Sequence, residues 1–526
     1  MASRGAGQGG AAVRALLLAG ALALAVLPAA AADVGVIYQS HCAACHGSDR
    51  VGGSGPALLP ENLARLKRVD AATTIRAGRA ATRMPAFGEV LSAADIDALA
   101  NWIYTPVSPS PRWRELDIRA SRIEYRAPDS LPAKPVFDAD PMNLFIVVES
   151  GDHHVSILDG DRMARIHRFP SRFALHGGPK FSPDGRFVYF ASRDGWITKY
   201  DLWNLETVAE VRAGINTRNL AVSSDGRYAM VANYLPHTLV LLDAGDLHPI
   251  EVIPVRDDNG KTSRVSAVYD AGPRHSFIAA LKDIPEVWEV IYADDPLPVY
   301  NGPMHDYRMG EGVARASGQF PVRRIRLDDY LDDFLFDQPY RLLIGAARNA
   351  NSGQVVQLDV GRKIADLDLD SMPHLASGIT WEYQGRTVLA TPHLKKNEVS
   401  IIDMTTWKTI KRIPTEGPGF FMRSHENTPY AWVDVFFGPN RDKVHIIDKR
   451  TLEIVKTLRP EPGKTAAHVE FDKDGRHALL SLWDMDGAVI VYDAATLQEV
   501  KRLPMVKPSG KYNVSNKINR SAGTSH

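Results

Sequence analysis

The sequence predicts a small all-α domain followed by a large all-β domain, and three observations support this prediction. Residues 33–108 show helical periodicity around the only two cysteines of the 526-residue chain. Residues 131–526 contain short alternating strands that recur at a nearly constant interval. Between these regions, three prolines within residues 106–111 interrupt both helix and ladder, so a domain boundary is expected there and 109–130 should be a linker.

The first 32 residues have the pattern of a secretory signal peptide. Arg4 and Arg14 precede an apolar run from Ala15 to Leu27, and a tract of alanines follows. This run is too short for a convincing membrane span, and no later segment reaches about 18 uninterrupted apolar residues. We therefore expect an exported mature chain without a membrane span.

The composition restricts the kinds of partner. Lys and Arg together number 62, as do Asp and Glu, which argues against a nucleic acid or another polyanion. Two cysteines cannot supply a disulfide framework, so the apolar core must hold the fold together. Small ligands and other proteins remain as partners.

The two cysteines belong to Cys42-Ala43-Ala44-Cys45-His46, which has the spacing of a covalent c-type haem site. Cys42 and Cys45 can each form a thioether with a haem vinyl group, and His46 can then be an axial iron ligand. A zinc half-site would need a second pair of ligands, and a redox disulfide would not need the histidine. Because haem is attached to such cysteines outside the bacterial cytoplasm, this motif and the signal peptide both predict the periplasm.

Helical patterning covers residues 34–38, 63–77 and 92–104. Met84 lies before Pro85 in the segment between the last two helices, which is typical of the sixth iron ligand in a small cytochrome c. The alternative is a methionine of the apolar core. The pattern as a whole predicts a cytochrome c domain that relays single electrons.

The C-terminal region repeats a strand that ends in aspartate. Successive aspartates are separated by 42, 42, 116, 44, 45 and 45 residues, and the long gap contains one more strand around Trp288. The repeat aspartates are Asp159, Asp201, Asp243, Asp359, Asp403, Asp448 and Asp493. Asp-Gly pairs at 184–185, 225–226 and 474–475 predict tight hairpin turns. Eight four-stranded units of this length predict an all-β eight-bladed propeller, which by itself would most often be a protein-binding scaffold.

A signal peptide, a small cytochrome c domain and an eight-bladed propeller together resemble cytochrome cd1 nitrite reductase and its relatives. The segment 173–178, followed by 182–186, is similar to the family segment whose histidine is the proximal ligand of haem d1. The segments 192–195, 201–203 and 214–218 follow at the family's spacing. The resemblance covers nearly the whole mature chain.

This resemblance implies roles for individual residues. His176 would ligate the iron of haem d1, and Arg193 and Arg218 would bind carboxylates of the macrocycle, a task that suits the permanently charged guanidinium. His374 would be a retained distal histidine, and Trp483 would contact the macrocycle. On its own, a histidine before two glycines is more often a turn or core residue.

Two departures from the reductase pattern concern the distal side. The reductases hold two distal histidines to protonate nitrite, but no histidine occurs between residues 307 and 373 here, and Asp332 is the nearest counterpart. His468 and Tyr512 occupy positions where the reductases have glutamine and phenylalanine. They could be a surface histidine and an interface tyrosine, but together they favour acid–base chemistry on a ligand.

That combination resembles the dihydro-haem d1 dehydrogenases, the paralogues that act in haem d1 biosynthesis beside the reductase of denitrification. Their reaction oxidises a propionate side chain of the d1 precursor to an acrylate. The resemblance implies haem c as bound cofactor, dihydro-haem d1 as substrate and haem d1 as product. It also implies a small cytochrome c or cupredoxin as electron acceptor, with nitrite reductase and other d1 biosynthesis proteins as further partners.

Two alternatives remain open from the sequence. The first is a nitrite reductase that works with one distal histidine, assisted by Asp332 or His468. The second is a carrier that delivers haem d1 without chemistry.

Overall fold

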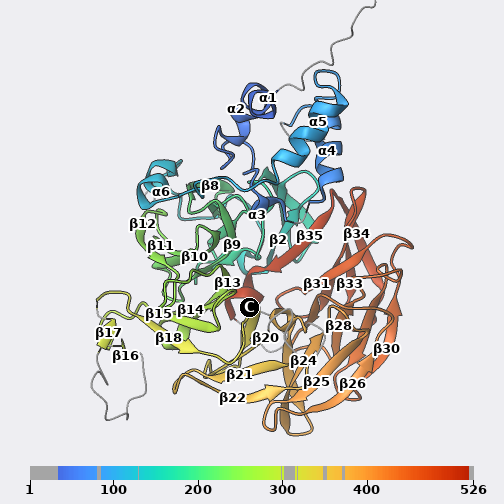
Figure 1. Cartoon of the computed structure of the whole chain (residues 1–526). Coiled ribbons are helices and arrows are strands. Elements are labelled where there is room, and N and C mark those ends of the chain that lie inside the picture. Colours follow the sequence, from blue (N-terminus) through green and yellow to red (C-terminus); the bar gives the residue numbers. More distant parts are fainter. Residues whose placement is uncertain are drawn as a thin grey trace, which may run out of the picture.

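The computed structural model describes most of the chain after the predicted signal peptide, and residues 1–32 lie outside the described part (Figure 1). Short gaps separate the described ranges. These ranges are residues 33–64, 66–79, 84–127, 130–297, 299–300, 314–316, 318–346, 352–369 and 373–519.

The N-terminal domain is helical, as predicted. Its helices are α1 (Val34–His41), α2 (Ala43–His46), α3 (Pro60–Leu63), α4 (Arg68–Ala77) and α5 (Ala93–Trp102). Buried side chains of α1, α4 and α5, among them Tyr38, Ile75 and Leu99, form one core cluster. Within the predicted helix over 63–77, α4 begins only at Arg68, because Lys67 is extended, and Leu63 is the last residue of the separate helix α3.

The C-terminal domain is the predicted propeller of eight four-stranded antiparallel sheets, one of which has an additional short outer strand. The first four sheets consist of β35 (Pro508–Asn513), β2 (Leu144–Glu149), β3 (His154–Asp159) and β4 (Ala164–Pro170); β5 (Lys180–Phe181), β6 (Phe187–Ala191), β7 (Trp196–Asp201) and β8 (Glu206–Arg212); β9 (Asn216–Val222), β10 (Tyr228–Leu235), β11 (Thr238–Asp243) and β12 (Pro249–Pro254); and β13 (Val265–Ala271), β14 (Ser276–Leu281), β15 (Glu286–Ile291) and β18 (Val322–Arg326).

The remaining four sheets follow in chain order. They consist of β19 (Asp333–Phe336), β20 (Leu342–Ala346), β21 (Gly353–Gln357) and β22 (Arg362–Leu367); β23 (Ile379–Tyr383), β24 (Arg386–Pro392), β25 (Glu398–Asp403) and β26 (Thr409–Pro414); β27 (Met422–Ser424), β28 (Tyr430–Asp434), β29 (Val444–Asp448) and β30 (Glu453–Leu458); and β31 (Ala466–Phe471), β32 (His477–Leu482), β33 (Gly487–Asp493) and β34 (Glu499–Met505). A small hairpin of β16 (Val299–Tyr300) and β17 (Ala314–Ala316) projects from the rim (Figure 1).

The repeated aspartates lie at or just after the third strand of their sheets, where they stabilise the following turn. Asp201, at the end of β7, accepts hydrogen bonds from the Trp203 amide at 2.9 Å and from Arg186 Nη2 at 2.8 Å. The long gap in the repeat contains β15, as predicted from Trp288. In the Asp-Gly turns only the glycine has a positive φ, for example 73° at Gly185, and in the first two turns the aspartate accepts the amide of the residue after the glycine.

The ring is closed by the end of the chain. Strand β35 pairs antiparallel with β2, with Ile146 opposite Tyr512 and Phe145 opposite Asn513. Helix α7 (Val514–Asn519) then follows directly. This closure places Tyr512 next to the first strand of the propeller, although most of the chain separates them in sequence.

The segment expected to be a linker contains structure of its own. Helix α6 (Glu115–Ser121) packs near β8, and β1 (Ile123–Glu124) pairs with β8 as an additional outer strand. The side chain of Trp113 donates a hydrogen bond to the Arg212 carbonyl at 2.8 Å. Residues 109–130 are therefore more than a plain connector, because part of this segment extends a propeller blade.

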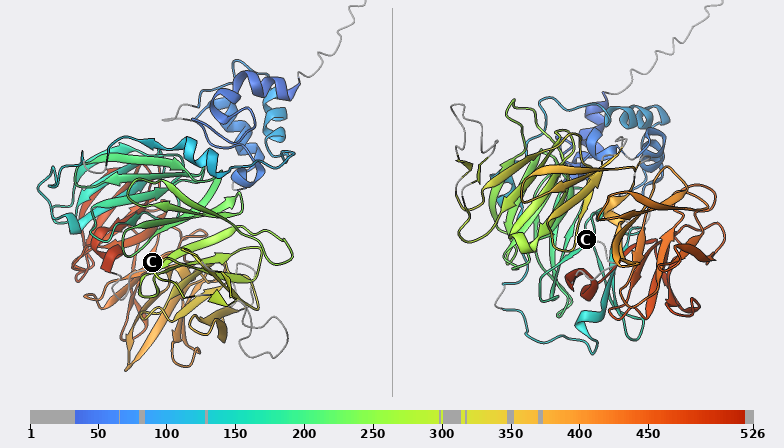
Figure 2. Two further views of the ribbon diagram at one scale, coloured as in Figure 1. Left: turned by 90° about the vertical axis from the view of Figure 1, so that its left-hand side faces the viewer. Right: turned by 90° about the horizontal axis from the view of Figure 1, so that it is seen from below.

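The helical domain rests against one side of the propeller, near β8 and β9 (Figures 1 and 2). Val51, Ala57 and Leu59 of the helical domain form a small apolar cluster with Ile215 and Leu235. Three hydrogen bonds surround this cluster. They run from Asn62 Nδ2 to the Ile215 carbonyl (3.0 Å), from Asn216 Nδ2 to the Glu61 carbonyl (3.2 Å) and from Arg212 Nη2 to the Val51 carbonyl.

Within the described ranges, no helix has both the length and the apolar character that a bilayer crossing requires.

Candidate active site

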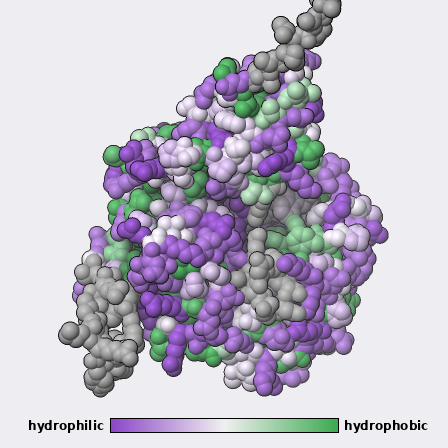
Figure 3. Space-filling model, viewed as in Figure 1, coloured by the Kyte–Doolittle hydropathy of each residue, from purple (hydrophilic) through white to green (hydrophobic). Residues whose placement is uncertain are grey.

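A cavity of about 770 Å³ opens within the propeller, a size within the usual range for a bound organic ligand. The face of the molecule seen in Figure 3 has a hollow near its middle, below the helical domain. Side chains from several blades and from the C-terminal segment line the cavity. It brings together all seven residues that the sequence assigned to the macrocycle or its chemistry, namely His176, Arg193, Arg218, His374, His468, Trp483 and Tyr512.

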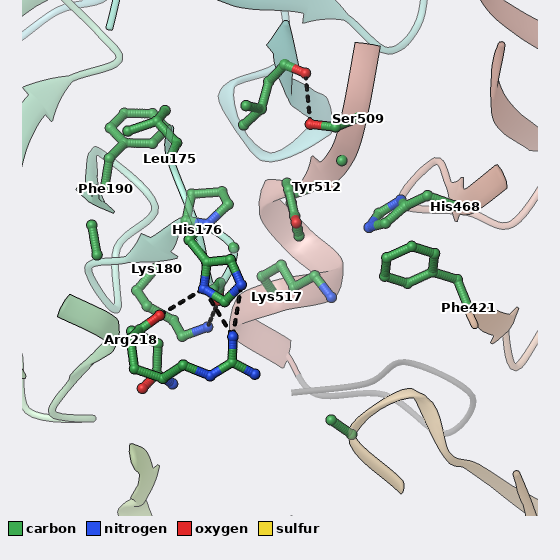
Figure 4. Close-up of a pocket in the computed structure, with 18 of the residues that line it drawn as sticks. Leu175, His176, Lys180, Phe190, Arg218, Phe421, His468, Ser509, Tyr512 and Lys517 are labelled. Carbon is green, nitrogen blue, oxygen red and sulfur yellow. Dashed lines mark hydrogen bonds between the residues drawn. The ribbon is translucent and has the colours of Figure 1, made fainter. Parts of the chain in front are cut away.

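His176 stands on the segment between β4 and β5, and its ring is fixed by Arg218. Nδ1 lies 2.7 Å from the Arg218 carbonyl oxygen, and Arg218 Nη1 lies 2.7 Å from Nε2 (Figure 4). The carbonyl can only accept, so Nδ1 carries the proton and Nε2 presents its lone pair. Metal-ligating histidines are commonly oriented in this way, which suits the predicted iron ligand.

The two glycines after His176 allow the loop to pass close to its neighbours. Gly177 and Gly178 have φ angles of 83° and 70°, a region that residues with a Cβ rarely adopt. A Cβ on Gly178 would lie 3.0 Å from Cε1 of Tyr512. This glycine therefore lets the His176 loop and the Tyr512 ring approach each other.

His468 projects from an irregularity in β31. A register shift between Ala467 and Val469 leaves His468 outside the ladder with a φ of 53°. Its amide donates to Asp434 Oδ2 at 3.2 Å, and Lys511 Nζ donates to its carbonyl oxygen. The bulge thus turns a strand residue toward the cavity, which is a common use of β-bulges beside active sites.

Aromatic rings surround the His468 imidazole. Its centroid lies 4.6 Å from the Phe421 ring and 5.2 Å from the Tyr512 ring (Figure 4). Only 2% of His468 is exposed. The two residues that gain ionisable groups relative to the reductase pattern are therefore neighbours, although they are far apart in sequence.

The surroundings fix the protonation of this pair. Burial, and then the charges of Lys511, Arg423 and Lys517, hold the pKa of His468 well below 6.5. Burial raises the pKa of the Tyr512 hydroxyl to about 12. At neutral pH the site therefore holds an uncharged imidazole that can accept a proton and a phenol that can donate a hydrogen bond.

The other predicted residues line the same cavity. His374 immediately precedes the short helix η4 (Leu375–Ser377), with Nδ1 2.6 Å from the Phe420 carbonyl oxygen. Trp483 Nε1 lies 3.3 Å from Ser150 Oγ. Arg193 comes shortly after the end of β6 and lines the cavity. Its amide donates to the Ala174 carbonyl at 3.1 Å.

Asp332 does not occupy the distal position that was expected for it. Its carboxylate pairs with Lys282, and it is absent from the described lining of the cavity. Asp333 lines the cavity instead, and its Oδ1 accepts from the Tyr269 hydroxyl at 2.9 Å. The two neighbouring carboxylates therefore point to opposite sides at the start of β19.

Sequence reasoning missed further lining residues. Arg79, from the helical domain, reaches the cavity and lies 5.4 Å from the Phe173 ring centroid. Arg423 and Lys517 also line it. Only Arg423 had a recognisable signal, as a single charge directly after the apolar run Phe420-Phe421-Met422.

The helical domain contains a site that fits a covalently bound haem. Cys42 and Cys45 flank the start of α2, and their side chains are partly buried. His46 Nδ1 lies 2.7 Å from the Pro56 carbonyl oxygen, which leaves Nε2 as the acceptor, and burial lowers its pKa. A Cβ on Gly55 would lie 2.9 Å from His46 Cε1, so glycine is needed beside this ring. Met84 packs against the core cluster of the same domain.

The family comparisons agree with both halves of this description. The model described as "Cytochrome D1 heme domain" matches residues 139–301 and 315–517. The chain belongs to the cytochrome d1 haem-domain family. Residues 29–103 match the model "Cytochrome C oxidase, cbb3-type, subunit III", which corresponds to the helical domain.

Within the cytochrome d1 haem-domain family, the chain is similar to two curated proteins along nearly its full length. It is 56% identical to "Dihydro-heme d1 dehydrogenase" of Pseudomonas aeruginosa, over 96% of this chain and 99% of that protein. It is 27% identical to "Nitrite reductase" of Stutzerimonas stutzeri, over 95% and 96%. The solved structure "Dihydro-heme d1 dehydrogenase NirN in complex with DHE" superposes with a TM-score of 0.86 at 56% identity, covering 92% of this chain and all of that one.

Proposed function

We propose that this protein is a dihydro-haem d1 dehydrogenase, which converts a propionate side chain of its macrocyclic substrate into an acrylate. The observation that carries the proposal is the convergence of His468 and Tyr512 in the cavity that also contains His176. Full-length similarity to a protein named for this activity supports it. Haem c is the bound cofactor, and dihydro-haem d1 and haem d1 are substrate and product.

In this proposal three residues hold the macrocycle. His176 binds the iron through Nε2, while Arg193 and Arg218 bind carboxylates at the edge of the ring. His374 lies on the opposite, distal side. Because Arg218 Nη1 contacts His176 Nε2, this guanidinium must shift toward a carboxylate when the iron is bound.

Forming the double bond removes two hydrogens from the side chain, as two protons and two electrons. His468 is uncharged and accepts one of the protons, and Tyr512 donates a hydrogen bond to the carboxylate or assists the second transfer. Because burial and three cations weaken His468 as a base, we expect more of the catalytic effect to depend on Tyr512. Cys42, Cys45, His46 and Met84 would hold haem c, which would accept the two electrons one at a time and pass each to the external acceptor.

The nitrite reductase alternative has less support. It would need Asp332 or His468 to assist His374, but Asp332 pairs with Lys282, and His468 is not in its acidic imidazolium form at neutral pH. The named reductase is also the more distant of the two full-length relatives. A carrier without chemistry would not need the acid–base pair.

The proposal also includes the cellular location, the partners and the domain bounds of the protein. The signal-like residues 1–32 and the haem attachment motif support a periplasmic location, with a small cytochrome c or a cupredoxin as electron acceptor. Nitrite reductase and other d1 biosynthesis proteins of denitrification are proposed as partners. The proposed domains are residues 33–108 for cytochrome c and 131–526 for the d1-binding propeller.

The decisive experiment is to incubate the purified protein with dihydro-haem d1 and an oxidant and to follow the absorption band of the conjugated acrylate. Product formation supports the dehydrogenase. Release of nitric oxide from nitrite would support the reductase, and transfer of unchanged macrocycle would support the carrier.

Variants of the acid–base pair test the assigned chemistry. Tyr512→Phe removes only the hydroxyl and should lower turnover by about 10²-fold or more, whereas His468→Ala should cost about 10²-fold at most. Both should still bind the macrocycle in a spectroscopic titration. Conversion by both variants at the parent rate would show that neither residue acts in the reaction.

A further inference from the structure

Three basic side chains, those of Arg423, Lys511 and Lys517, lie near His468 and Tyr512. Arg423 is 5% exposed and Lys511 is fully buried, while Lys517 is partly buried. Arg423 and Lys517 line the cavity. Figure 4 shows the Lys517 amino group directed into the space between Tyr512 and the His468–Phe421 pair.

The two buried carboxylates nearby are largely occupied by other groups. Asp434 accepts from the backbone amides of Phe420 (2.8 Å), Phe421 (3.0 Å) and His468 (3.2 Å). Its three hydrogen bonds therefore stabilise the backbone around His468 and leave little capacity for a side-chain cation.

Glu470 pairs with Lys517, at 3.6 Å from Oε2 to Nζ. Its Oε1 accepts from the Phe471 amide at 3.0 Å and from Asn516 Nδ2 at 3.3 Å. Glu470 thus uses Oε1 for two amide donors and directs Oε2 toward Lys517.

Arg423 is incompletely satisfied. Nη1 donates to the Met422 carbonyl at 2.9 Å, but Nε has no hydrogen-bond partner within the described residues. Leaving a buried charged donor unpaired is costly, so such an arrangement is expected where a ligand supplies the missing acceptor. In agreement, burial lowers the pKa of Lys517 to about 7, a shift that a bound anion would oppose.

We propose that Arg423 and Lys517 form a carboxylate-binding recess that holds the carboxylate of the side chain undergoing dehydrogenation. This inference rests on the proposed function and specifies how the substrate is oriented. With its carboxylate in the recess, the two methylene groups of the side chain lie beside Tyr512 and His468. The recess therefore selects which side chain of the macrocycle is oxidised.

The recess also assists the chemistry. Removing a proton next to a carboxylate develops negative charge on that group, and two fixed cations stabilise it in a water-poor site. Arg218 lies with His176 on the other side of the cavity from His468 (Figure 4), and Arg193 also lines the cavity, so both are assigned to the other carboxylates of the macrocycle.

The test compares two forms of the ligand on several proteins. Affinities of dihydro-haem d1 and of its methyl ester are measured by titration with the full-length protein, Arg423→Gln and Lys517→Met. For each protein, the ratio of the two affinities measures how much binding is lost on esterification. This ratio should be about 10- to 100-fold larger for the parent than for either variant, because the contact that the parent loses is charge-assisted. Lys517→Arg keeps the charge and should behave like the parent.

Lys501→Met is the matched control, because Lys501 is an exposed lysine on β34, away from the cavity. It should show the parent's ratio of affinities. The haem c spectrum and a melting curve check that each variant is folded. If Arg423→Gln is not folded, the comparison of Lys517→Met with the parent tests the recess. An equal ratio in parent and folded variants would refute the recess. Failure of the parent itself to bind or convert the free acid would instead refute the proposed function.

Discussion

His468 shows how a single side chain is tuned by what surrounds it. Its ring lies beside those of Phe421 and Tyr512, its amide is held by Asp434 and its carbonyl by Lys511. Burial and the adjacent cations keep the imidazole unprotonated well below pH 6.5. The same environment that prepares it to accept a proton also limits its strength as a base.

A pH dependence of stability follows from this depressed pKa. Between the folded pKa and the unfolded value of about 6.5, the unfolded state binds the extra proton, so acidification favours unfolding. The parent should lose stability from pH 7.5 to 5.5, and His468→Gln should lose about 1 kcal/mol less over this range. Chemical denaturation at the two pH values measures the difference, and parallel losses would show that His468 is protonated in the folded protein.

At this scale, the sequence predicted the residues that belong to a recognisable pattern. His176, Arg193 and Arg218 were found because their segments resemble a family, and all three line the cavity. Arg423 and Lys517 were missed because nothing in the local sequence indicates that a side chain of β27 and one of helix α7 meet in the cavity. Asp332 was misplaced because a gap of one residue reverses the side of a strand.

Among the larger elements, the loop after His176 links the proximal side of the cavity to its catalytic side. Gly178 has a positive φ and faces the Tyr512 ring. Gly260 provides a comparison, because it has a φ of 82° but no atom within 4 Å of its would-be Cβ.

Substitutions at these two glycines distinguish the effect of backbone strain from the effect of displacing Tyr512. Gly178→Ala and Gly260→Ala should each cost about 1 kcal/mol of stability, since both place a Cβ in the left-handed region. Only Gly178→Ala should also lower turnover, by roughly 10-fold or more, because it moves the tyrosine. Thermal unfolding and the acrylate assay measure the two effects. Unchanged turnover in folded Gly178→Ala would show that the contact is dispensable.

Element prediction succeeded where the repeat was regular. The aspartate-ended strands and β15 were found because alternation and turn chemistry are local properties. Helix α6 and strand β1 were not, because they depend on packing against β8, and a short exposed segment shows little periodicity of its own.

For the molecule as a whole, Arg212 is a principal connection between the two domains. Its Nη2 donates to the Val51 carbonyl of the helical domain, and its Nε donates to the Asp194 carbonyl in the propeller at 2.9 Å. Its guanidinium also lies 4.7 Å from the Trp113 ring centroid. The eight blades could be counted from the sequence, but this docking could not, because contacts between domains leave no periodic signal.

Removing this connection should uncouple the domains. We expect the parent to unfold with coincident transitions in the haem c spectrum and in far-ultraviolet circular dichroism. Arg212→Ala, which loses charged hydrogen bonds worth about 2 kcal/mol or more, should separate them. Arg126→Ala, at an exposed arginine paired with Glu206, is the control. Coincident transitions in Arg212→Ala would show that the docking depends on the apolar cluster.

The closure of the ring by β35 determines when the binding cavity comes into existence. Tyr512 and Lys517 belong to the last part of the described chain, and β35 reaches its partner β2 only after every other blade has been synthesised. A chain that ends before β35 lacks Tyr512 and Lys517, and with them one part of the cavity lining and the phenol of the acid–base pair. The full lining of the cavity therefore depends on the strand that is synthesised last among the strands of the propeller.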